Sequence, residues 1–226
     1  MERRSTGRNE PVNLAFRLAH VPSRTLLLVQ LAAVLLYPWF DTAHGQGVVT
    51  AISVGVLFAA VWMVRRSPRE AWIAALLAVF GIGAHAAWLW TGTVALGVAG
   101  AAGYAAAFFY SAVALVAYMM QDERTTTDEL WAAGATFMLF VEGYAWLFAG
   151  TQLLQPGAFE VAGLATQPLT WVQLLFLSAT NMSATGLSDI YPATPHARVL
   201  VLVAQWNGVM YLAVVVARLA GLLRRR

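Results

Sequence analysis

The stretch from Trp171 to Arg218 combines polar and turn-forming residues in an order that could coordinate an ion. A short apolar run, Leu169–Ala184, carries hydroxyl and amide side chains and is followed by Gly186 and Asp189. A half-length helix entering a membrane points its C-terminal partial negative charge inward, and extended backbone after it offers carbonyl oxygens to a dehydrated cation. The pattern therefore favours a pore-loop arrangement.

The elements that must position this stretch are apolar segments long enough to cross a hydrocarbon layer, which takes about 20 helical residues. They cover Thr25–Phe40, Val48–Val64, Ala71–Trp90, Val94–Met120, Glu129–Leu153 and about Thr194–Leu223. The run Leu169–Ala184 is too short and polar to cross, so we expect it to be re-entrant and buried in protein. We predict an all-α integral membrane protein of six transmembrane helices, with a re-entrant pore loop between the fifth and sixth.

Composition supports this fold class and excludes several chemistries. Of 226 residues, 60% are hydrophobic and 11% are charged, against about 25% charged in soluble domains. The chain has no Cys, and all 14 basic residues are Arg. Disulfides, thiol catalysis, Cys-bound zinc, a Walker P-loop and a Lys Schiff base are therefore excluded.

The distribution of Arg predicts the topology. With a cytoplasmic N-terminus and six crossings, every Arg except Arg198 lies on the cytoplasmic side, as the positive-inside rule requires. We therefore expect a multi-pass protein of the cell (inner) membrane with both termini in the cytoplasm. The Arg residues lie where topology needs them and the chain has no soluble domain for readout, so no nucleic-acid partner is expected.

The fourth apolar segment, Val94–Met120, has glycine at every third position and no arginine. Gly97, Gly100 and Gly103 would let a neighbouring helix approach closely. A voltage sensor needs a row of Arg within a span, so voltage gating by that route is not expected.

Two parts of the second half carry a family resemblance. They are Ser188–Leu200 (SDIYPATPHARVL) and Tyr211–Leu219 (YLAVVVARL), supported by Gly143–Trp146 and Leu154–Phe159. These stretches resemble the pore domain of potassium channels, most closely bacterial six-span members of the ion channel superfamily.

The resemblance implies a three-part organisation. Residues 1–24 would form a cytoplasmic segment, 25–127 a four-helix transmembrane domain without voltage-sensing arginines, and 128–226 the pore domain of outer helix, pore helix, filter and inner helix. One pore loop cannot encircle an ion, so the resemblance also implies a homotetramer in the lipid bilayer. It implies no cofactor, and no metal other than a permeant monovalent ion.

The family's filter pattern, Thr-Val-Gly-Tyr-Gly-Asp, falls on Ala184 to Asp189 and retains Gly186 and Asp189. Ala184 lacks the hydroxyl that closes the inner end of the filter, and Leu187 lacks the aromatic tether. Ser188 replaces a glycine, and we expect it to pay roughly 1 kcal/mol for left-handed geometry. The departures predict altered or relaxed ion selectivity.

Neighbouring polar residues complete the predicted pore. Ser183, Thr185 and Ser188 would line the axis through hydroxyls or carbonyls, or else pack against the adjacent pore helix. Asn181 supplies polarity within the predicted pore helix.

The last helix and the preceding span contribute further candidates. In the resemblance, Gly208 occupies the position where the inner helix bends, while Gln205 or Asn207 would face the cavity. Glu142 lies mid-span, where a lone carboxylate is costly. It is either a protonatable gate element, a partner of the pore segment from behind, or a structural acid.

Histidines also enter the predictions. His196 lies beside Arg198 near the predicted outer mouth and is a candidate for pH sensing or for repelling cations. Alternatively, Arg198 would pair with Asp189 or Glu160. His85 is expected to be a hydrogen-bonded core histidine rather than a proton relay.

The function predicted from the sequence is passive ion conduction by a tetrameric potassium-channel-like protein. The alternative is a channel-like structural or regulatory membrane protein that conducts nothing. A secondary transporter is disfavoured because no second broken helix is present. No hydrolase or metal-binding motif is found, so neither an enzyme nor a small-molecule substrate is expected.

Overall fold

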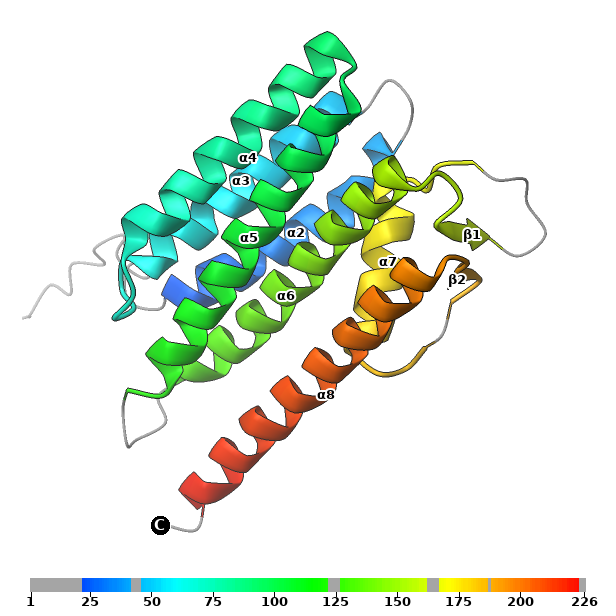
Figure 1. Ribbon diagram of the computed structural model, residues 1–226. Helices are drawn as coiled ribbons and strands as arrows, with labels where there is room; N and C mark the ends of the chain where they lie inside the picture. The colour runs from blue at the N-terminus through cyan, green and yellow to red at the C-terminus, as the bar shows by residue number, and fades with distance from the viewer. Residues whose placement is uncertain (1–21, 42–45, 122–126, 162–166, 187, 224–226) are drawn as a thin grey trace, which may run out of the picture.

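The computed structural model describes residues 22–41, 46–121, 127–161, 167–186 and 188–223 (Figure 1). Its elements are α2 (Pro22–Phe40), α3 (Gln46–Val64), α4 (Ala71–Thr91), α5 (Val94–Met119), α6 (Thr127–Leu154), β1 (Phe159–Val161), α7 (Trp171–Met182), β2 (Ile190–Pro192) and α8 (Pro195–Leu223). All of these helices except α7 are long and apolar enough to span a membrane, which is the signature of a multi-pass membrane protein. They confirm the six predicted segments to within a few residues at each end.

Helices α4 and α5 are in close contact, and glycine makes this contact feasible. A Cβ placed on Gly103 would lie 2.6 Å from the Cα of Gly81, and one on Gly100 would lie 2.8 Å from the backbone nitrogen of His85. Gly97 meets the side chains of Trp88 and Leu153. The glycine stripe therefore serves close packing, as its spacing predicts.

Helix α6 is the central helix of the bundle. It packs against α5, α2 and α7 (Figure 1), and 67% of its apolar segment is buried. At one end, Asp128 accepts hydrogen bonds from the hydroxyls of Ser23 (2.9 Å) and Tyr118 (2.9 Å). Three helix ends are thus joined by one carboxylate.

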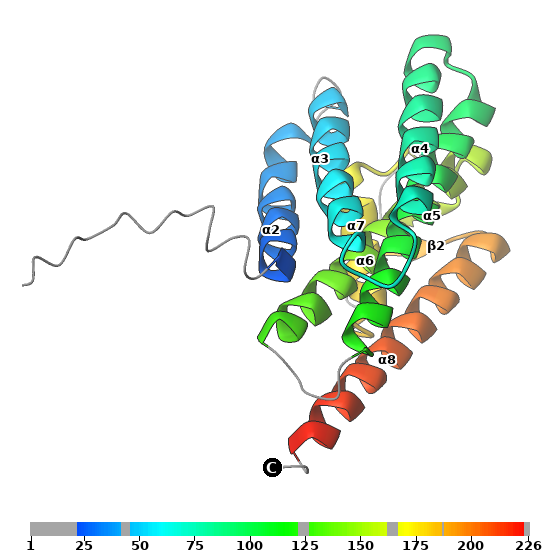
Figure 2. The same cartoon turned by 90° about the vertical axis from the view of Figure 1, so that its left-hand side faces the viewer.

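Helix α8 lies at the edge of the bundle, where it contacts mainly α6, α7 and β2. Both views show it set apart from α2, α3 and α4 (Figures 1 and 2). We call the end of the bundle at which α8 begins the His196 end, and the opposite end the Arg218 end.

A short antiparallel ribbon covers part of the His196 end. Strands β1 and β2 pair Glu160 with Tyr191, and the Tyr191 hydroxyl donates to the Glu160 carboxylate (2.8 Å). The Ala193 amide also donates to the Ala158 carbonyl (2.9 Å). The ribbon therefore links the exit of α6 to the start of α8.

Candidate functional site

The start of α7 is fixed by a capping box and by two distant side chains. The Thr170 amide donates to the Gln173 side chain (2.9 Å), while the Thr170 hydroxyl accepts from the Gln173 amide. That hydroxyl also donates to Asp41 at the end of α2 (2.6 Å). The Gln152 amide group of α6 bonds both backbone groups of Leu169. A negative Asp41 at this helix N-terminus is favourable electrostatically.

From there α7 runs into the bundle interior for 12 residues, about 18 Å at the usual helical rise. This confirms that the run Leu169–Ala184 forms a helix too short to cross about 30 Å of hydrocarbon. The Ser178 hydroxyl donates to the Val141 carbonyl of α6 (2.7 Å). This bond replaces one that the buried hydroxyl would make in water.

Glu142 is the next residue along α6 after Val141. Its side chain is fully buried, and among the described residues neither carboxyl oxygen has a hydrogen-bond partner. Burying such a group without partners costs several kcal/mol at least. The structure thus gives the residue no stabilising role, and the predicted gate function stays a prediction.

The C-terminal end of α7 turns back on itself through Ala184. The Ala184 amide donates to the Asn181 carbonyl (3.0 Å) and the Thr185 amide to the Thr180 carbonyl (3.1 Å), which is a Schellman motif. Ala184 has φ 57°, the left-handed region. Ser188 does not lie in the left-handed region, so the cost expected for a serine in that geometry does not arise there.

Hydroxyls of the predicted filter segment face this helix end. Those of Ser183 and Thr185 both donate to the Thr180 carbonyl (3.2 Å each) and lie 3.1 Å from each other. The Ser188 hydroxyl instead accepts from the Ile190 amide (3.0 Å). Within a single protomer these hydroxyls serve local turns, while residues 184–186 are exposed.

Helix α8 holds the same end of α7 from the other side. A Cβ on Gly208 would overlap the Met182 carbonyl, so only glycine fits there. The Gln205 side chain donates to the Asn181 side chain (2.8 Å), and Asn181 donates to the Leu177 carbonyl (2.7 Å). The structure brings together the predicted residues Asn181, Gln205 and Gly208.

The remaining predicted residues are spread along the segment and helix. Asn207 lines a groove with Tyr144, while Asp189 is exposed. Leu187 lies outside the described residues. Helix α8 is continuous through Gly208, so its bending stays a prediction.

At the His196 end, the histidine has a specific partner. The Gln155 side-chain amide lies 3.1 Å from Nδ1 of His196 and accepts from the Thr194 hydroxyl (3.0 Å). Arg198 donates to the Pro192 carbonyl (3.2 Å). The alternative that Arg198 pairs with Asp189 or Glu160 is wrong, because Tyr191 occupies the Glu160 carboxylate and the arginine turns to the backbone.

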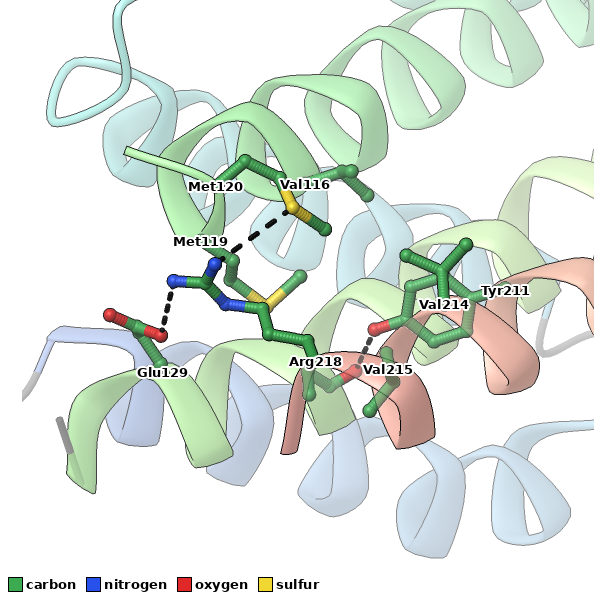
Figure 3. Close-up of a pocket in the computed structure, with 9 residues that line it drawn as sticks. Val116, Met119, Met120, Glu129, Tyr211, Val214, Val215 and Arg218 are labelled. Atoms are coloured by element: carbon green, nitrogen blue, oxygen red, sulfur yellow. Dashed lines mark hydrogen bonds and ion pairs between the residues drawn. The ribbon is translucent and has the colours of Figure 1, made fainter. Parts of the chain in front are cut away.

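At the Arg218 end, an ion pair attaches α8 to α6. Arg218 lies 3.1 Å from Glu129, and its guanidinium also reaches the sulfur of Met120 (Figure 3). Earlier in α8, the Tyr211 hydroxyl donates to the Ala133 carbonyl of α6 (2.6 Å). No pattern in the sequence predicts this pairing.

Sequence reasoning also missed Asp41 and Gln152, which position α7. The Thr170–Gln173 spacing is a readable capping signal. Asp41 and Gln152 contact residues that lie 129 and 17 positions away in the sequence. No local pattern predicts such contacts. His85 is buried and lies 3.4 Å from the Thr50 hydroxyl, consistent with a core histidine.

No family model, curated protein or solved structure matches this chain.

Proposed function

We propose that the protein is a homotetrameric ion channel of the potassium-channel type, in which α7 is the pore helix and residues 183–189 form an altered filter. Four copies would meet around an axis that passes beside these residues. Transport would be passive. The Arg distribution supports an inner-membrane location with both termini in the cytoplasm.

The observation that carries the proposal is the state of the carbonyl oxygens after α7. None of the described residues donates a hydrogen bond to the carbonyls of Ala184, Thr185 or Gly186, and these three residues are exposed. Exposed backbone groups at membrane depth need a partner. A permeating cation, with its water, would supply one.

The packing of α8 supports assembly from several copies. Only 22% of its apolar segment is buried within one protomer. Large apolar side chains remain exposed along it: Val199, Leu202, Val203, Trp206, Val209, Met210, Leu212, Val214 and Val216. Lipid and neighbouring copies would cover them in a tetramer.

A specific observation favours the nonconducting alternative. The Thr180 carbonyl, at the end of α7 that would face the ion, accepts from two amides and two hydroxyls of its own chain. Helix-end dipoles capped in this way attract a cation less strongly. A channel-like scaffold would have no need of an exposed helix end.

The test compares two glycines that share one geometry. Gly186 (φ +61°) and Gly92 (φ +67°) both have open space where a Cβ would lie. Alanine costs each about 1–2 kcal/mol through the left-handed backbone. Current is recorded from purified protein in a planar bilayer under a potassium chloride gradient, with the oligomer mass measured on the same sample.

The wild type should be tetrameric and should show a reversal potential displaced toward the potassium equilibrium value. Gly186→Ala should shift or abolish that potential, while Gly92→Ala should conduct normally at equal thermal stability. Silence from folded, tetrameric wild-type protein across voltage and pH would establish the scaffold instead. Equal currents from both variants would remove Gly186 from the conduction path.

A further inference from the structure

A cavity of about 510 Å³ opens at the His196 end, between helices α2 to α6 and the start of α7. Its volume falls in the range of small-molecule sites. It lies behind α7, away from residues 184–186, so it is separate from the proposed pore. Asp41, Gln152 and Thr170, which fix the start of α7, form part of its wall.

Aromatic rings dominate the wall. Trp88, Trp146 and Trp171 line it together with His85, so three of the nine tryptophans gather at one cavity. The rings of Trp146 and Trp171 are 4.7 Å apart, and His85 lies 5.2 Å from Trp88 and 5.4 Å from Trp146. The four rings form one continuous aromatic wall.

Two of the three indole N–H groups are turned away from the cavity, since the nitrogens of Trp146 and Trp171 are fully buried. Tyr104 stacks on one face of Trp146, with ring centroids 4.1 Å apart. At Trp146 and Trp171 a ligand therefore meets ring carbon rather than N–H, and an aromatic face that is left open attracts cations. A ligand that depends on accepting indole hydrogen bonds is disfavoured.

The charge of the wall has the same sign as the π faces. Among the described residues that line the cavity, Asp41 is the one charged side chain. Thr170 and Val172 both bond its Oδ2 atom, and none of the described residues bonds its Oδ1 atom. A carboxylate beside several aromatic faces, with no Arg in the described wall, complements an organic cation.

We propose that this cavity binds an organic ammonium ion, with the charged group against Trp88 and Asp41 and its apolar part against the remaining rings. The ammonium group comes either from a soluble amine or from a choline-type lipid headgroup. The ligand would be held against the start of α7. This site goes beyond ion conduction and does not depend on it, because binding is measured without current.

The probe is benzyltrimethylammonium, compared with neopentylbenzene, in which carbon replaces the charged nitrogen. Affinity is measured by calorimetric titration of the full-length protein in an uncharged detergent. The wild type should bind the cation at least about tenfold more tightly than the neutral isostere. Trp88→Leu and Asp41→Asn should each remove most of this preference, and Asp41→Asn keeps an acceptor for Thr170.

Trp90→Leu is the matched control, because Trp90 lies on the same helix, is 91% exposed and does not line the cavity. It should bind like the wild type. Equal affinity for the two isosteres would overturn the proposal in favour of a neutral ligand. So would unchanged binding in Trp88→Leu and Asp41→Asn proteins that unfold at the wild-type temperature.

Two bilayer arms distinguish the sources of the ammonium group. Nanodiscs of phosphatidylcholine are compared with nanodiscs of an uncharged glycolipid. A weaker apparent affinity for the probe in phosphatidylcholine, abolished by Trp88→Leu, identifies the headgroup as the occupant. The same affinity in both bilayers identifies a soluble amine.

Discussion

Helices α6 and α8 are almost equal in length, 28 and 29 residues, yet they are held in different ways. In α6, 67% of the apolar segment is buried, against 22% in α8. Helix α6 is packed along its length by α5, α2 and α7. Helix α8 is attached to the rest of the protein at separate points, and many of its apolar side chains stay exposed.

The points of attachment of α8 are mostly polar. They are the β1–β2 ribbon at the His196 end, the Gln205–Asn181 bond beside Gly208 in the middle, and the Arg218–Glu129 ion pair at the far end. Directional bonds fix the register of a helix without enclosing it. Low burial is not special to α8, because only 17% of the apolar segment of α4 is buried. What separates α6 from α8 is how each is held: α6 by apolar packing along its length, and α8 mainly by a few polar contacts at separate points.

The largest expected effect comes from separating α4 from α5. Gly103→Leu places a side chain where a Cβ would already lie 2.6 Å from the Gly81 backbone, so α4 and α5 must separate. We expect a loss of more than about 3 kcal/mol in the free energy of unfolding. Thermal unfolding in detergent measures it.

Two controls accompany this substitution. Gly83→Leu gains the same helix propensity on α4 but meets nothing within 4 Å, and Ala213→Leu enlarges an exposed position of α8. Both should unfold close to the wild-type temperature. A large loss in Ala213→Leu would contradict the view that the α8 surface is open within the protomer.

These contacts show what the sequence could and could not predict. Hydropathy located all six long helices, because an apolar run of such length has few other destinations. The glycine spacing predicted the α4–α5 contact in kind. The left-handed backbone at Ala184 was not predicted, because it depends on how the α7 helix ends and not on the filter pattern. Pairs such as Asp41 and Thr170 depend on the assembled fold.

A smaller effect distinguishes the two buried glutamates of α6. Glu129 is paired with Arg218, whereas Glu142 has no hydrogen-bond partner among the described residues. Glu129→Gln removes the Glu129 charge beside Arg218 and should cost about 2 kcal/mol at most, reduced by the partial exposure of the arginine. Glu142→Leu removes an unsatisfied buried acid and should gain about 1 kcal/mol. Chemical unfolding measures the change in the free energy of unfolding for each variant, including its sign.

The conductance of the Glu142→Leu variant tests whether this acid is a gate element. If Glu142 is a gate element, the more stable Glu142→Leu protein loses its dependence on pH or stays fixed in one conducting state. If the Glu142→Leu protein carries wild-type currents, Glu142 is not a gate element. A stabilised Glu129→Gln protein would show that the ion pair does not hold α8.

The smallest effect lies in the ribbon that begins α8. The hydrogen bond from Tyr191 to the Glu160 carboxylate, together with its charge, raises the pKa of the exposed Tyr191 above its ordinary 10.0. A raised pKa means that the bond stabilises the fold below pH 10 and that this contribution is lost as pH rises through the folded pKa. The wild type should therefore lose slightly more thermal stability above pH 10 than Tyr191→Phe. Glu160→Gln keeps an acceptor but removes the charge, so its loss of stability above pH 10 should lie between those of the wild type and Tyr191→Phe. Parallel alkaline curves for all three proteins would mean that the ribbon is held by backbone pairing alone, with α8 fixed at its start by the Gln155 contacts to Thr194 and His196.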